Sequence, residues 1–399
     1  MRLVYITSSL PYGPGEVFLV PEVQELRARG HEVAVVPLYP RGRIVHKEAQ
    51  SLYDPRFCKP LMSWEILLTA IRTFRGAPLH SLKALGMLFT SNPKHFAKNL
   101  IAYLKGLWLA EVARKWGADH MHVHWAATTA SMTMVASEVS GIPWSFTAHR
   151  WDVVENNLLK RKALHARFFR CISQKTLEMA RERGVPQDRL LVLHLGVRLP
   201  NGVASKKVGN AEGFVVLCPG ALTAIKGHKY LIEAMLHLPS DVKLWLAGEG
   251  ELRPVLEEQV KELGLGERVR FLGHLPHEKL LNLYQQSKVN VVVLPSVDLG
   301  GGFNEGIPVA LMEAMAFGIP VVSTQTGGIP ELLGGEAGLL VPPGDAKALA
   351  EAIRRLYQDV RFAQRLGMAG QRRVREEFAV EEVAKRLEEL FADKPRLGR

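Results

Sequence analysis

The hydrophobic and polar positions of the chain alternate between short apolar runs and longer amphipathic stretches. In the first half, apolar runs typical of buried strands occupy residues 3–7, 33–37, 120–124 and 144–147. Residues 16–29 have the spacing of an amphipathic helix, and residues 61–116 are predicted to be mostly helical. The chain therefore opens as a strand–helix–strand unit.

A second set of apolar runs follows a polar, turn-rich stretch at residues 200–213. These runs occupy residues 214–218, 242–247, 269–272, 289–294 and 321–323. Helix-length segments separate them, which is the pattern of a parallel sheet covered on both faces. We predict an α/β fold with two Rossmann-like domains whose parallel sheets face an inter-domain cleft.

The predicted domains are residues 1–198 and 213–377, joined by a linker at 199–212. Residues 378–399 complete the chain as an amphipathic helix and tail, with apolar positions at i, i+3/i+4 and i+7. Because open α/β sheets bind ligands outside the carboxyl ends of their strands, the chemistry is expected at those ends.

Composition narrows the class of protein. The chain has 399 residues, 47% hydrophobic and 23% charged, which is typical of a globular protein. Its three cysteines form no CxxC pair, so neither a disulfide framework nor a zinc ribbon is predicted. The opening apolar run is too short for a signal peptide, and no stretch approaches the roughly 18 uncharged apolar residues of a membrane span. A cytoplasmic protein is expected.

The charge is divided unevenly along the chain. Residues 1–200 carry a formal net charge of +12, whereas residues 201–399 carry −1. Such asymmetry indicates an anionic partner, such as a membrane surface, nucleic acid or a phosphorylated substrate, or it serves solubility alone.

The strongest chemical pattern is a pair of carboxylates, Glu305 and Glu313, behind the glycine run 300–302. If both lie on one helix, they are about 12 Å apart along its axis. That separation suits the two ends of a nucleotide sugar better than a glycosidase pair, which needs roughly 5 to 9.5 Å. Backbone N–H groups of Val309 and Ala310 at the helix start would favour a diphosphate. The alternative is a surface helix with two solvated glutamates.

This stretch closely resembles the Glu-x7-Glu motif of the retaining family-4 (group 1) glycosyltransferases, which have the GT-B fold. The resemblance covers nearly the whole chain and, with the opening helix and the Glu-Gly-Ile-Pro form of the motif, is greatest to colanic-acid-type enzymes of bacterial exopolysaccharide assembly. It implies that Glu313 binds the donor ribose and Glu305 the donor sugar. The backbone that it assigns to the sugar and phosphates belongs to Gly306, Ile307, Val309 and Ala310.

Lys226 follows the predicted strand 214–218, and Gly220 after that strand is counted with the donor-binding residues. An ammonium there can neutralise a leaving diphosphate. The resemblance implies that role for Lys226, together with an arginine five residues earlier. This chain has Ala221 at that position.

The first domain offers its own candidates. His149 follows the strand 144–147, and the resemblance implies that it contacts the donor sugar beside the reacting carbon; alternatively it caps the next helix. Gly13, Gly15 and Glu16 lie in the first strand–helix loop, which is a weak nucleotide signal but matches an acceptor-side loop of the family. His124 is expected near the same cleft.

Two further patterns were weighed. His120, His122 and His124 share one face of a strand, but alternate side chains about 7 Å apart suit one zinc ion poorly. No Asp-x-Asp occurs, so a metal site is not predicted. Residues 94–116 are basic and amphipathic, which is compatible with a lipid surface or with ordinary core packing.

The predicted function is a retaining, metal-independent hexosyl transfer from a nucleoside-diphosphate sugar to a hydroxyl acceptor. His149, Glu305 and Lys226 are the predicted catalytic residues. The expected partners are the donor, a saccharide or lipid-linked acceptor and an anionic inner-leaflet surface, with no cofactor and no nucleic acid. The alternatives are a sugar-nucleotide epimerase on the same fold and a catalytically weak donor-binding subunit.

Overall fold

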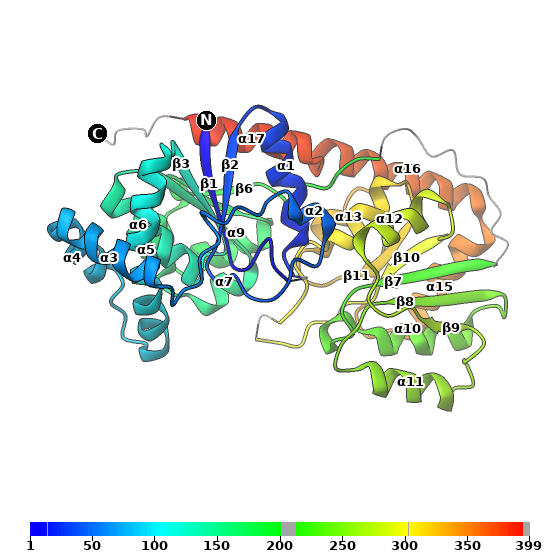
Figure 1. Cartoon of the computed structure of the whole chain (residues 1–399). Helices are drawn as coiled ribbons and strands as arrows, with labels where there is room; N and C mark the ends of the chain where they lie inside the picture. Colours follow the sequence, from blue (N-terminus) through cyan, green and yellow to red (C-terminus); the bar gives the residue numbers. More distant parts are fainter. Residues whose placement is uncertain (14, 201–212, 302, 394–399) are drawn as a thin grey trace. The chain divides into compact units, whose positions relative to one another are not determined.

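The computed structural model describes residues 1–13, 15–200, 213–301 and 303–393. These residues form two compact units (Figure 1). Unit 1 comprises residues 1–196 together with the segment from Glu381 onward, and unit 2 comprises residues 197–380. The predicted linker at 199–212 falls largely on residues 201–212, which lie outside the described residues.

Unit 1 is built on a parallel sheet whose strands, among the described residues, lie in the order β2-β1-β3-β4-β5-β6. The strands are β1 (Arg2–Thr7), β2 (Glu32–Pro37), β3 (His120–His124), β4 (Trp144–Ala148), β5 (Phe169–Cys171) and β6 (Leu190–Val192). The helices are η1 (Val17–Leu19), α1 (Val20–Ala28), α2 (Lys47–Gln50), α3 (Trp64–Gly76), α4 (Pro78–Met87), α5 (Pro93–Trp116), α6 (Thr128–Ser140), α7 (Arg150–Glu155), α8 (Leu159–His165), α9 (Gln174–Glu182), η2 (Gln187–Arg189) and, from Glu381 on, α17 (Val380–Ala392).

The two faces of this sheet bury different cores because successive strand residues point to opposite sides. Val4 and Ile6 pack with the helices of residues 64–140. Leu3 and Tyr5 pack with α1 and with the apolar side of α17, including Leu387 and Phe391. The amphipathic C-terminal segment predicted from the sequence therefore completes the core of unit 1 (Figure 1).

Unit 2 has a parallel sheet in the order β12-β11-β10-β7-β8-β9. Its strands are β7 (Phe214–Pro219), β8 (Val242–Ala247), β9 (Val269–Phe271), β10 (Val291–Leu294), β11 (Val321–Thr324) and β12 (Leu339–Val341). Its helices are η3 (Ala224–Lys226), α10 (His228–Ala234), η4 (Met235–His237), α11 (Arg253–Glu262), α12 (His277–Gln285), α13 (Val309–Ala316), α14 (Ile329–Leu333), α15 (Ala346–Gln358) and α16 (Val360–Glu377). The prediction of an α/β fold with two Rossmann-like parallel sheets is confirmed.

Each sheet has a switch point, where the strand order reverses and the chain leaves neighbouring strands in opposite directions. It lies between β1 and β3 in unit 1 and between β7 and β10 in unit 2. Ligands of open α/β sheets bind beside the carboxyl ends of strands at such points. Among the described residues, no helix combines the length and apolar composition needed to cross a bilayer.

Candidate functional site

The switch point of unit 2 brings Lys226 and Glu305 together. Lys226 ends η3, in the loop after β7, and Glu305 lies in the loop after β10. The Lys226 Nζ donates to Glu305 Oε2 over 2.6 Å, and both side chains are only about a fifth exposed. Ser296 Oγ lies 3.4 Å from the same carboxylate oxygen. Two of the three predicted catalytic residues are therefore one ion pair.

Glycines allow the backbone to approach closely around this pair. Gly227 has φ +66°, and a Cβ there would lie 2.0 Å from the Pro295 carbonyl oxygen. Gly327, with φ +59°, faces the Glu305 carbonyl, which a Cβ would approach to 1.7 Å. Side chains other than glycine would push these loops apart. The sequence analysis did not single out Gly227 or Gly327, although paired loop glycines such as 327–328 are a turn signal.

Helix α13 begins later than the sequence predicted. Val309 is its first residue and Pro308 precedes it with an extended backbone. Glu305 lies in the loop before the helix, so the prediction that both carboxylates share one helix is wrong. The separation of about 12 Å along a helix axis therefore does not apply to this pair. Proline cannot continue a helix backwards, because it restricts the residue before it to extended conformations.

The start of α13 remains open to an anion. Val309 and Ala310 are partly exposed, Gly306 is also partly exposed, and Ile307 is buried beneath the loop. The first N–H groups of a helix have no partner within it, which makes this end favourable for negative charge. Gly220 has φ +146°, and its Cβ position would lie 3.6 Å from Lys226 Cε, so it borders the same ammonium.

Glu313, on the second turn of α13, is held by a residue that the sequence analysis missed. Glu313 Oε1 lies 2.6 Å from Nε2 of His277, the first residue of α12. The two side chains are 15% and 18% exposed. The contact spans 36 residues of sequence, so no local pattern indicates it.

The family resemblance places an arginine where this chain has Ala221. His228, two residues after Lys226, does not supply the missing positive charge. That ring is buried, and burial together with the Lys226 charge lowers its pKa to about 4, so it is neutral near pH 7. The ammonium of Lys226 is thus the cation that the described contacts place beside Glu305.

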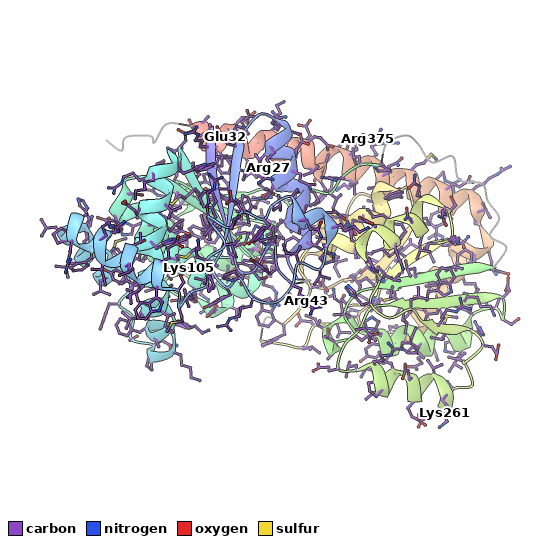
Figure 2. All side chains as sticks on the ribbon, in the orientation of Figure 1. Arg27, Glu32, Arg43, Lys105, Lys261 and Arg375 are labelled. Carbon is purple, nitrogen blue, oxygen red and sulfur yellow. The ribbon has the colours of Figure 1, made fainter. Side chains whose placement is uncertain are left out.

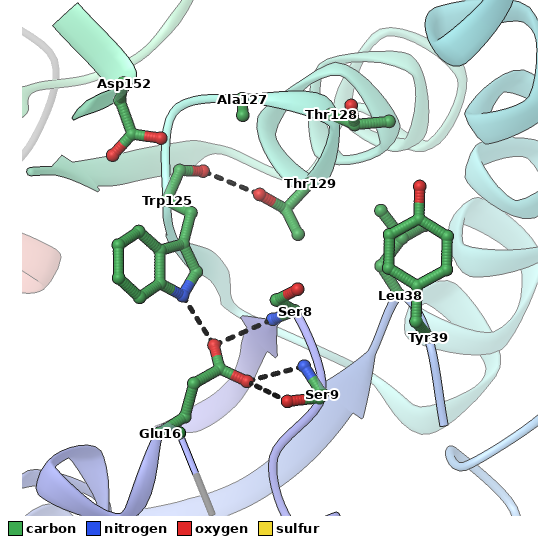
Figure 3. Close-up of a pocket in the computed structure, with 11 residues that line it drawn as sticks. Ser8, Ser9, Glu16, Leu38, Tyr39, Trp125, Ala127, Thr128, Thr129 and Asp152 are labelled. Carbon is green, nitrogen blue, oxygen red and sulfur yellow. Dashed lines mark hydrogen bonds between the residues drawn. The ribbon is translucent and has the colours of Figure 1, made fainter. Parts of the chain in front are cut away.

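The switch point of unit 1 contains a cavity of about 360 Å³ (Figure 3). Its walls come from the loops after β1, β2 and β3, from the first turn of α6 and from α7. The lining residues are Ser8, Ser9, Gly15, Glu16, Leu38, Tyr39, Trp125, Ala127, Thr128, Thr129 and Asp152. Two of the residues predicted on the acceptor side, Gly15 and Glu16, thus border one cavity.

Glu16 binds the loop that forms one wall of this cavity. Its carboxylate accepts from the Ser8 N–H at 3.0 Å and the Ser9 hydroxyl at 2.8 Å (Figure 3). It also accepts from the Leu10 N–H at 2.8 Å. The indole N–H of Trp125 and the N–H of Ser9 donate to it as well. These five donors use all the hydrogen-bond acceptor sites of the Glu16 carboxylate. Glu16 therefore shapes the cavity wall.

Gly13, the remaining glycine of that loop, has φ +71° and donates its N–H to the Arg43 carbonyl over 3.0 Å. It joins the loop after β1 to the loop after β2 and is not one of the described cavity-lining residues.

His149 and His124 meet side by side in unit 1. Their Nε2 atoms are 2.6 Å apart, and the Trp125 ring stacks on His149 with centroids 4.2 Å apart. His149 also precedes α7, where its N–H donates to Asp152 over 2.8 Å. Burial and the charge of Arg170 lower the pKa of His149 to about 3. The ring is therefore neutral across the physiological range.

A buried polar chain continues from His124. Its Nδ1 lies 3.5 Å from the Tyr5 hydroxyl, which donates to Glu22 over 2.6 Å. Arg170 Nη1 donates to the other oxygen of Glu22 over 2.8 Å, and both charged side chains are nearly inaccessible. Because Tyr5 donates to Glu22, its oxygen is left to accept from His124 Nδ1–H. That leaves His124 Nε2 as acceptor and His149 Nε2–H as donor. The charge pair thus sets the tautomer of His149.

The other two histidines of β3, His120 and His122, form hydrogen bonds with hydroxyl groups of β4. His120 Nε2 and His122 Nδ1 each lie 2.8 Å from Ser145 Oγ, and His122 Nε2 lies 2.9 Å from Thr147 Oγ1. Within the part of the chain that the structure describes, no group of three or more acidic, histidine or cysteine side chains is arranged to hold a metal ion.

The basic stretch 94–116 is not uniformly directed to solvent. Lys105 (Figure 2) is fully buried, and its ammonium donates to the carbonyls of Pro37, Leu38 and Lys59 over 2.7 to 2.8 Å. Burial lowers its pKa to about 7. For Lys105 the lipid-surface interpretation of the stretch 94–116 is wrong, because its ammonium links α5 to the end of β2 and to the loop at Lys59.

The predicted site residues form two groups. Lys226, Glu305, Glu313, Gly220 and the 306–310 backbone belong to unit 2. His149, His124, Gly13, Gly15 and Glu16 belong to unit 1. Each group lies near the carboxyl ends of the strands at its own switch point, with His149 after the neighbouring strand β4 and Glu313 on the second turn of α13.

Two family models match the chain. Residues 16–196 match the glycosyl transferase 4-like domain, and residues 204–373 match the glycosyl transferases group 1 domain. The first covers most of unit 1 and the second most of unit 2.

Relatives agree with these matches. The chain is 32% identical over 215 residues to the amylovoran biosynthesis glycosyltransferase AmsK of Erwinia amylovora, with 52% of each chain covered. It is 34% identical over 179 residues to the putative colanic acid glycosyltransferase WcaL of Escherichia coli K12, with 44% of each covered. The similarity thus spans about half the length of these relatives. Over a longer alignment, this chain is 26% identical to the putative teichuronic acid glycosyltransferase TuaC of Bacillus subtilis, with 89% of each chain covered.

Solved structures agree on the fold. Anabaena HepE, crystallised with UDP, superposes with a TM-score of 0.69 at 19% identity, covering 98% of this chain and 99% of HepE. A glycosyltransferase of Rickettsia africae gives a TM-score of 0.70 at 17% identity, covering 98% of this chain and 97% of that one. The two domain models and the relatives together show that the chain belongs to the group 1 glycosyltransferases, with the GT-B fold.

Proposed function

We propose that this glycosyltransferase moves a hexosyl unit from a nucleoside-diphosphate sugar to a hydroxyl of a saccharide or lipid-linked acceptor. The observation that carries the proposal is the Lys226–Glu305 pair, at 2.6 Å, in the loops that meet beside the start of α13. An ammonium and a helix N-terminus together suit a diphosphate leaving group. In a site closed to water, such stabilisation of developing charge is the largest catalytic contribution of many enzymes.

The two carboxylates bind opposite ends of the donor in this proposal. Glu313, oriented by His277, accepts hydrogen bonds from the ribose hydroxyls. Glu305, oriented by Lys226, accepts them from the transferred sugar. Both carboxylates are partly buried and already positioned by a neighbour, which reduces the ordering that binding requires.

The cavity of unit 1 receives the acceptor. It combines the Trp125 and Tyr39 rings with the hydroxyl groups of Ser8, Thr128 and Thr129. Aromatic walls with a few placed polar groups are typical of small-molecule sites. His149, whose ring stacks on the cavity residue Trp125, is neutral and in this proposal contacts the donor sugar through hydrogen bonds, without acting as an acid or base.

The same family resemblance leads us to propose that the enzyme retains the anomeric configuration of the sugar and needs no metal ion. The sequence contains no Asp-x-Asp, and Lys226 supplies positive charge where a metal ion would otherwise serve. NMR of the product anomer tests retention, and transfer in the presence of EDTA tests metal independence. An inverted anomer, or transfer that requires Mg²⁺ or Mn²⁺, would contradict these two parts of the proposal.

The relatives indicate polysaccharide or glycolipid assembly as the context. AmsK, WcaL and TuaC are named for amylovoran, colanic acid and teichuronic acid, respectively. A relative from Corynebacterium glutamicum is named a GDP-mannose-dependent mannosyltransferase, whereas HepE was crystallised with UDP-glucose. Donor panels should therefore contain both UDP and GDP sugars.

A catalytically weak donor-binding subunit remains the second candidate, because Ala221 replaces one of two expected cations. Slow hydrolysis of the donor without acceptor supports an enzyme, whereas saturable donor binding without any turnover supports the subunit. None of the relatives reported above is described as an epimerase, so that alternative receives no support.

The decisive experiment is a thermal-shift panel of sugar nucleotides in the presence of EDTA. A ligand at 100 times its dissociation constant stabilises by about 2.7 kcal/mol. Glu313→Gln should weaken sugar nucleotide and bare nucleotide alike, whereas Glu305→Gln should weaken mainly the sugar nucleotide. Glu351→Gln, an exposed carboxylate of α15, is the matched control. Equal losses in both site variants would show that the assigned ends of the donor are wrong, and no stabilisation by any nucleotide would refute the proposal.

A further inference from the structure

Unit 1 exposes an unusual concentration of large apolar side chains on and beside α3, α4 and α5. We call this the α3–α5 surface. Its members, with their exposed fractions, are Met62 (92%), Trp64 (78%), Leu68 (58%), Ile71 (42%), Leu79 (80%), Leu82 (54%), Phe89 (66%), Leu100 (45%), Ile101 (51%) and Leu104 (41%). Single exposed apolar residues are normal on a protein surface, but a contiguous group marks an interaction site.

Helix α3 is apolar on both of its faces. Ile66, Ala70 and Thr73 are buried against the unit, whereas Trp64, Leu68 and Ile71 project outward at i, i+4 and i+7. A helix that only covers a core has a polar outer face. The outward apolar stripe therefore has no role in the fold of unit 1.

The three helices form one continuous surface. Helix α3 packs along α5, and α4 contacts both. The Phe89 ring after α4 meets the Phe96 ring in the first turn of α5 edge to face, with centroids 5.9 Å apart. Figure 1 shows α3, α4 and α5 gathered on one side of unit 1.

The charge of this surface is mainly positive, and the exposed Glu65 of α3 is paired with Lys59 at 2.7 Å. Residues 66–104 contain no Asp or Glu and five Lys or Arg, namely Arg72, Arg75, Lys83, Lys94 and Lys98. All five are exposed. Lys83 and Lys98 also reach acidic residues outside the segment, Glu138 and Glu155.

We infer that the α3–α5 surface docks unit 1 on an anionic lipid bilayer. Amphipathic helices with Trp, Phe and Leu on one side and Lys or Arg beside them lie in the interfacial plane of membranes. Tryptophan favours that depth, and each cation near an anionic leaflet adds attraction that salt weakens. The surface differs from the basic stretch 94–116 of the sequence analysis, because α3 and α4 supply most of its apolar area.

This inference goes beyond the proposed function and does not depend on which donor the enzyme uses. A second copy of the chain is the competing occupant. The excess of positive charge disfavours it, because a symmetric contact would oppose like charges, and Glu65, the acidic residue beside Trp64, is already paired with Lys59.

The test is cosedimentation of the full chain with vesicles, run beside sedimentation velocity of the protein alone. The chain should bind vesicles of phosphatidylglycerol and phosphatidylcholine at low salt, bind pure phosphatidylcholine far less, and be partly released at 0.5 M salt. Without lipid it should sediment independently of concentration. Brominated lipid should quench its fluorescence, and Trp64→Phe should reduce that quenching.

Two sets of variants with matched controls complete the test. The triple change Arg72→Gln, Arg75→Gln and Lys94→Gln should lower vesicle affinity about a hundredfold, at about fivefold per cation. The triple change Trp64→Glu, Leu79→Glu and Leu82→Glu should abolish binding. The controls alter equally exposed residues of unit 2, by Lys261→Gln, Lys347→Gln and Arg361→Gln and by Leu236→Glu, Val255→Glu and Met368→Glu.

Thermal melts of every variant establish that each is folded, since all the altered side chains are exposed. Nucleotide binding should persist in the surface variants, which separates this inference from the proposed function. The inference is overturned if the intact chain ignores anionic vesicles at low salt or if the control sets reduce binding as much. Self-association that the Trp64, Leu79 and Leu82 variant abolishes would assign the surface to a dimer instead.

Discussion

Acid should unfold unit 1 well before unit 2, because unit 1 buries a cluster of neutral histidines. Burial lowers the pKa of His120 and of His149 to about 3, from a usual value of 6.5. Burial and neighbouring positive groups hold the pKa values of His122 and His124 well below 6.5. In unit 2 the corresponding case is His228, whose pKa burial lowers to about 4.

The size of the effect follows from proton linkage. Between pH 6.5 and 5, His120 and His149 each take up a proton when the chain unfolds, and the lowered pKa values of His122 and His124 act in the same direction, so lowering the pH favours unfolding. Asp152 opposes them: burial raises its pKa from 3.8 to about 7, so the folded chain holds a proton there that the unfolded chain lacks. For His120, His149 and Asp152 the net uptake is about one proton, or about 1.4 kcal/mol per pH unit at full slope. Integrated from pH 6.5 to 5, these three groups cost about 1.5 kcal/mol of stability, and His122 and His124 add to that loss.

Intrinsic fluorescence is a suitable assay, because six of the seven tryptophans lie in residues 1–196 and only Trp245 lies in unit 2. Denaturant midpoints measured from pH 7 to 5 should fall steeply for this signal. His120→Gln should reduce the uptake by about one proton, whereas His80→Gln, at a largely exposed ring, should not change it. A midpoint that stays constant over this range, or an unchanged slope in His120→Gln, would refute the account of the buried cluster.

Three further changes test the contacts that shape the two switch points. Glu16→Gln places an amide N–H₂ among N–H donors and should lower the free energy of unfolding by about 2 to 4 kcal/mol in urea titrations. Arg170→Met leaves the Glu22 carboxylate buried without its partner and should cost about 3 to 5 kcal/mol, part of which a second change, Glu22→Met, should restore. Gly227→Ala should weaken nucleotide binding at least tenfold by calorimetry, while Gly266→Ala, where a Cβ meets no atom within 4 Å, should leave it unchanged.

The sequence predicted β1 to β4 and β7 to β11, because apolar residues predominate in most of these strands and turn-forming segments separate them. It missed β5, β6 and β12, which have three residues each. β5 is also interrupted by Arg170, a charged residue that the sequence pattern places outside a core. In the structure, Glu22 and two carbonyl groups accept hydrogen bonds from the Arg170 guanidinium. Partners 23 or more residues away make this burial possible, and no local pattern records them.

The same limit applies to the candidate site. The sequence placed Lys226 after its strand and Glu305 and Glu313 around one helix start, since strand ends and the motif are local features. It did not indicate that Lys226 binds Glu305 or that His277 binds Glu313, because the partners are 79 and 36 residues apart in the sequence. The late start of α13 could have been predicted, because Pro308 marks a helix boundary.

The Lys226–Glu305 pair has a consequence for how the donor enters. In the proposed function both groups must exchange partners, since the ammonium turns to the diphosphate and the carboxylate to the sugar. Before that exchange, the Lys226 ammonium and the Glu305 carboxylate are paired at 2.6 Å, and each side chain is about a fifth exposed. Neither charge is therefore left unpaired where water solvates it poorly. The exchange replaces the single bond of the pair with one from the ammonium to the diphosphate and one from a sugar hydroxyl to the carboxylate, so binding does not have to order mobile side chains. The close backbone contacts at Gly227 and Gly327 hold both loops in place during that exchange.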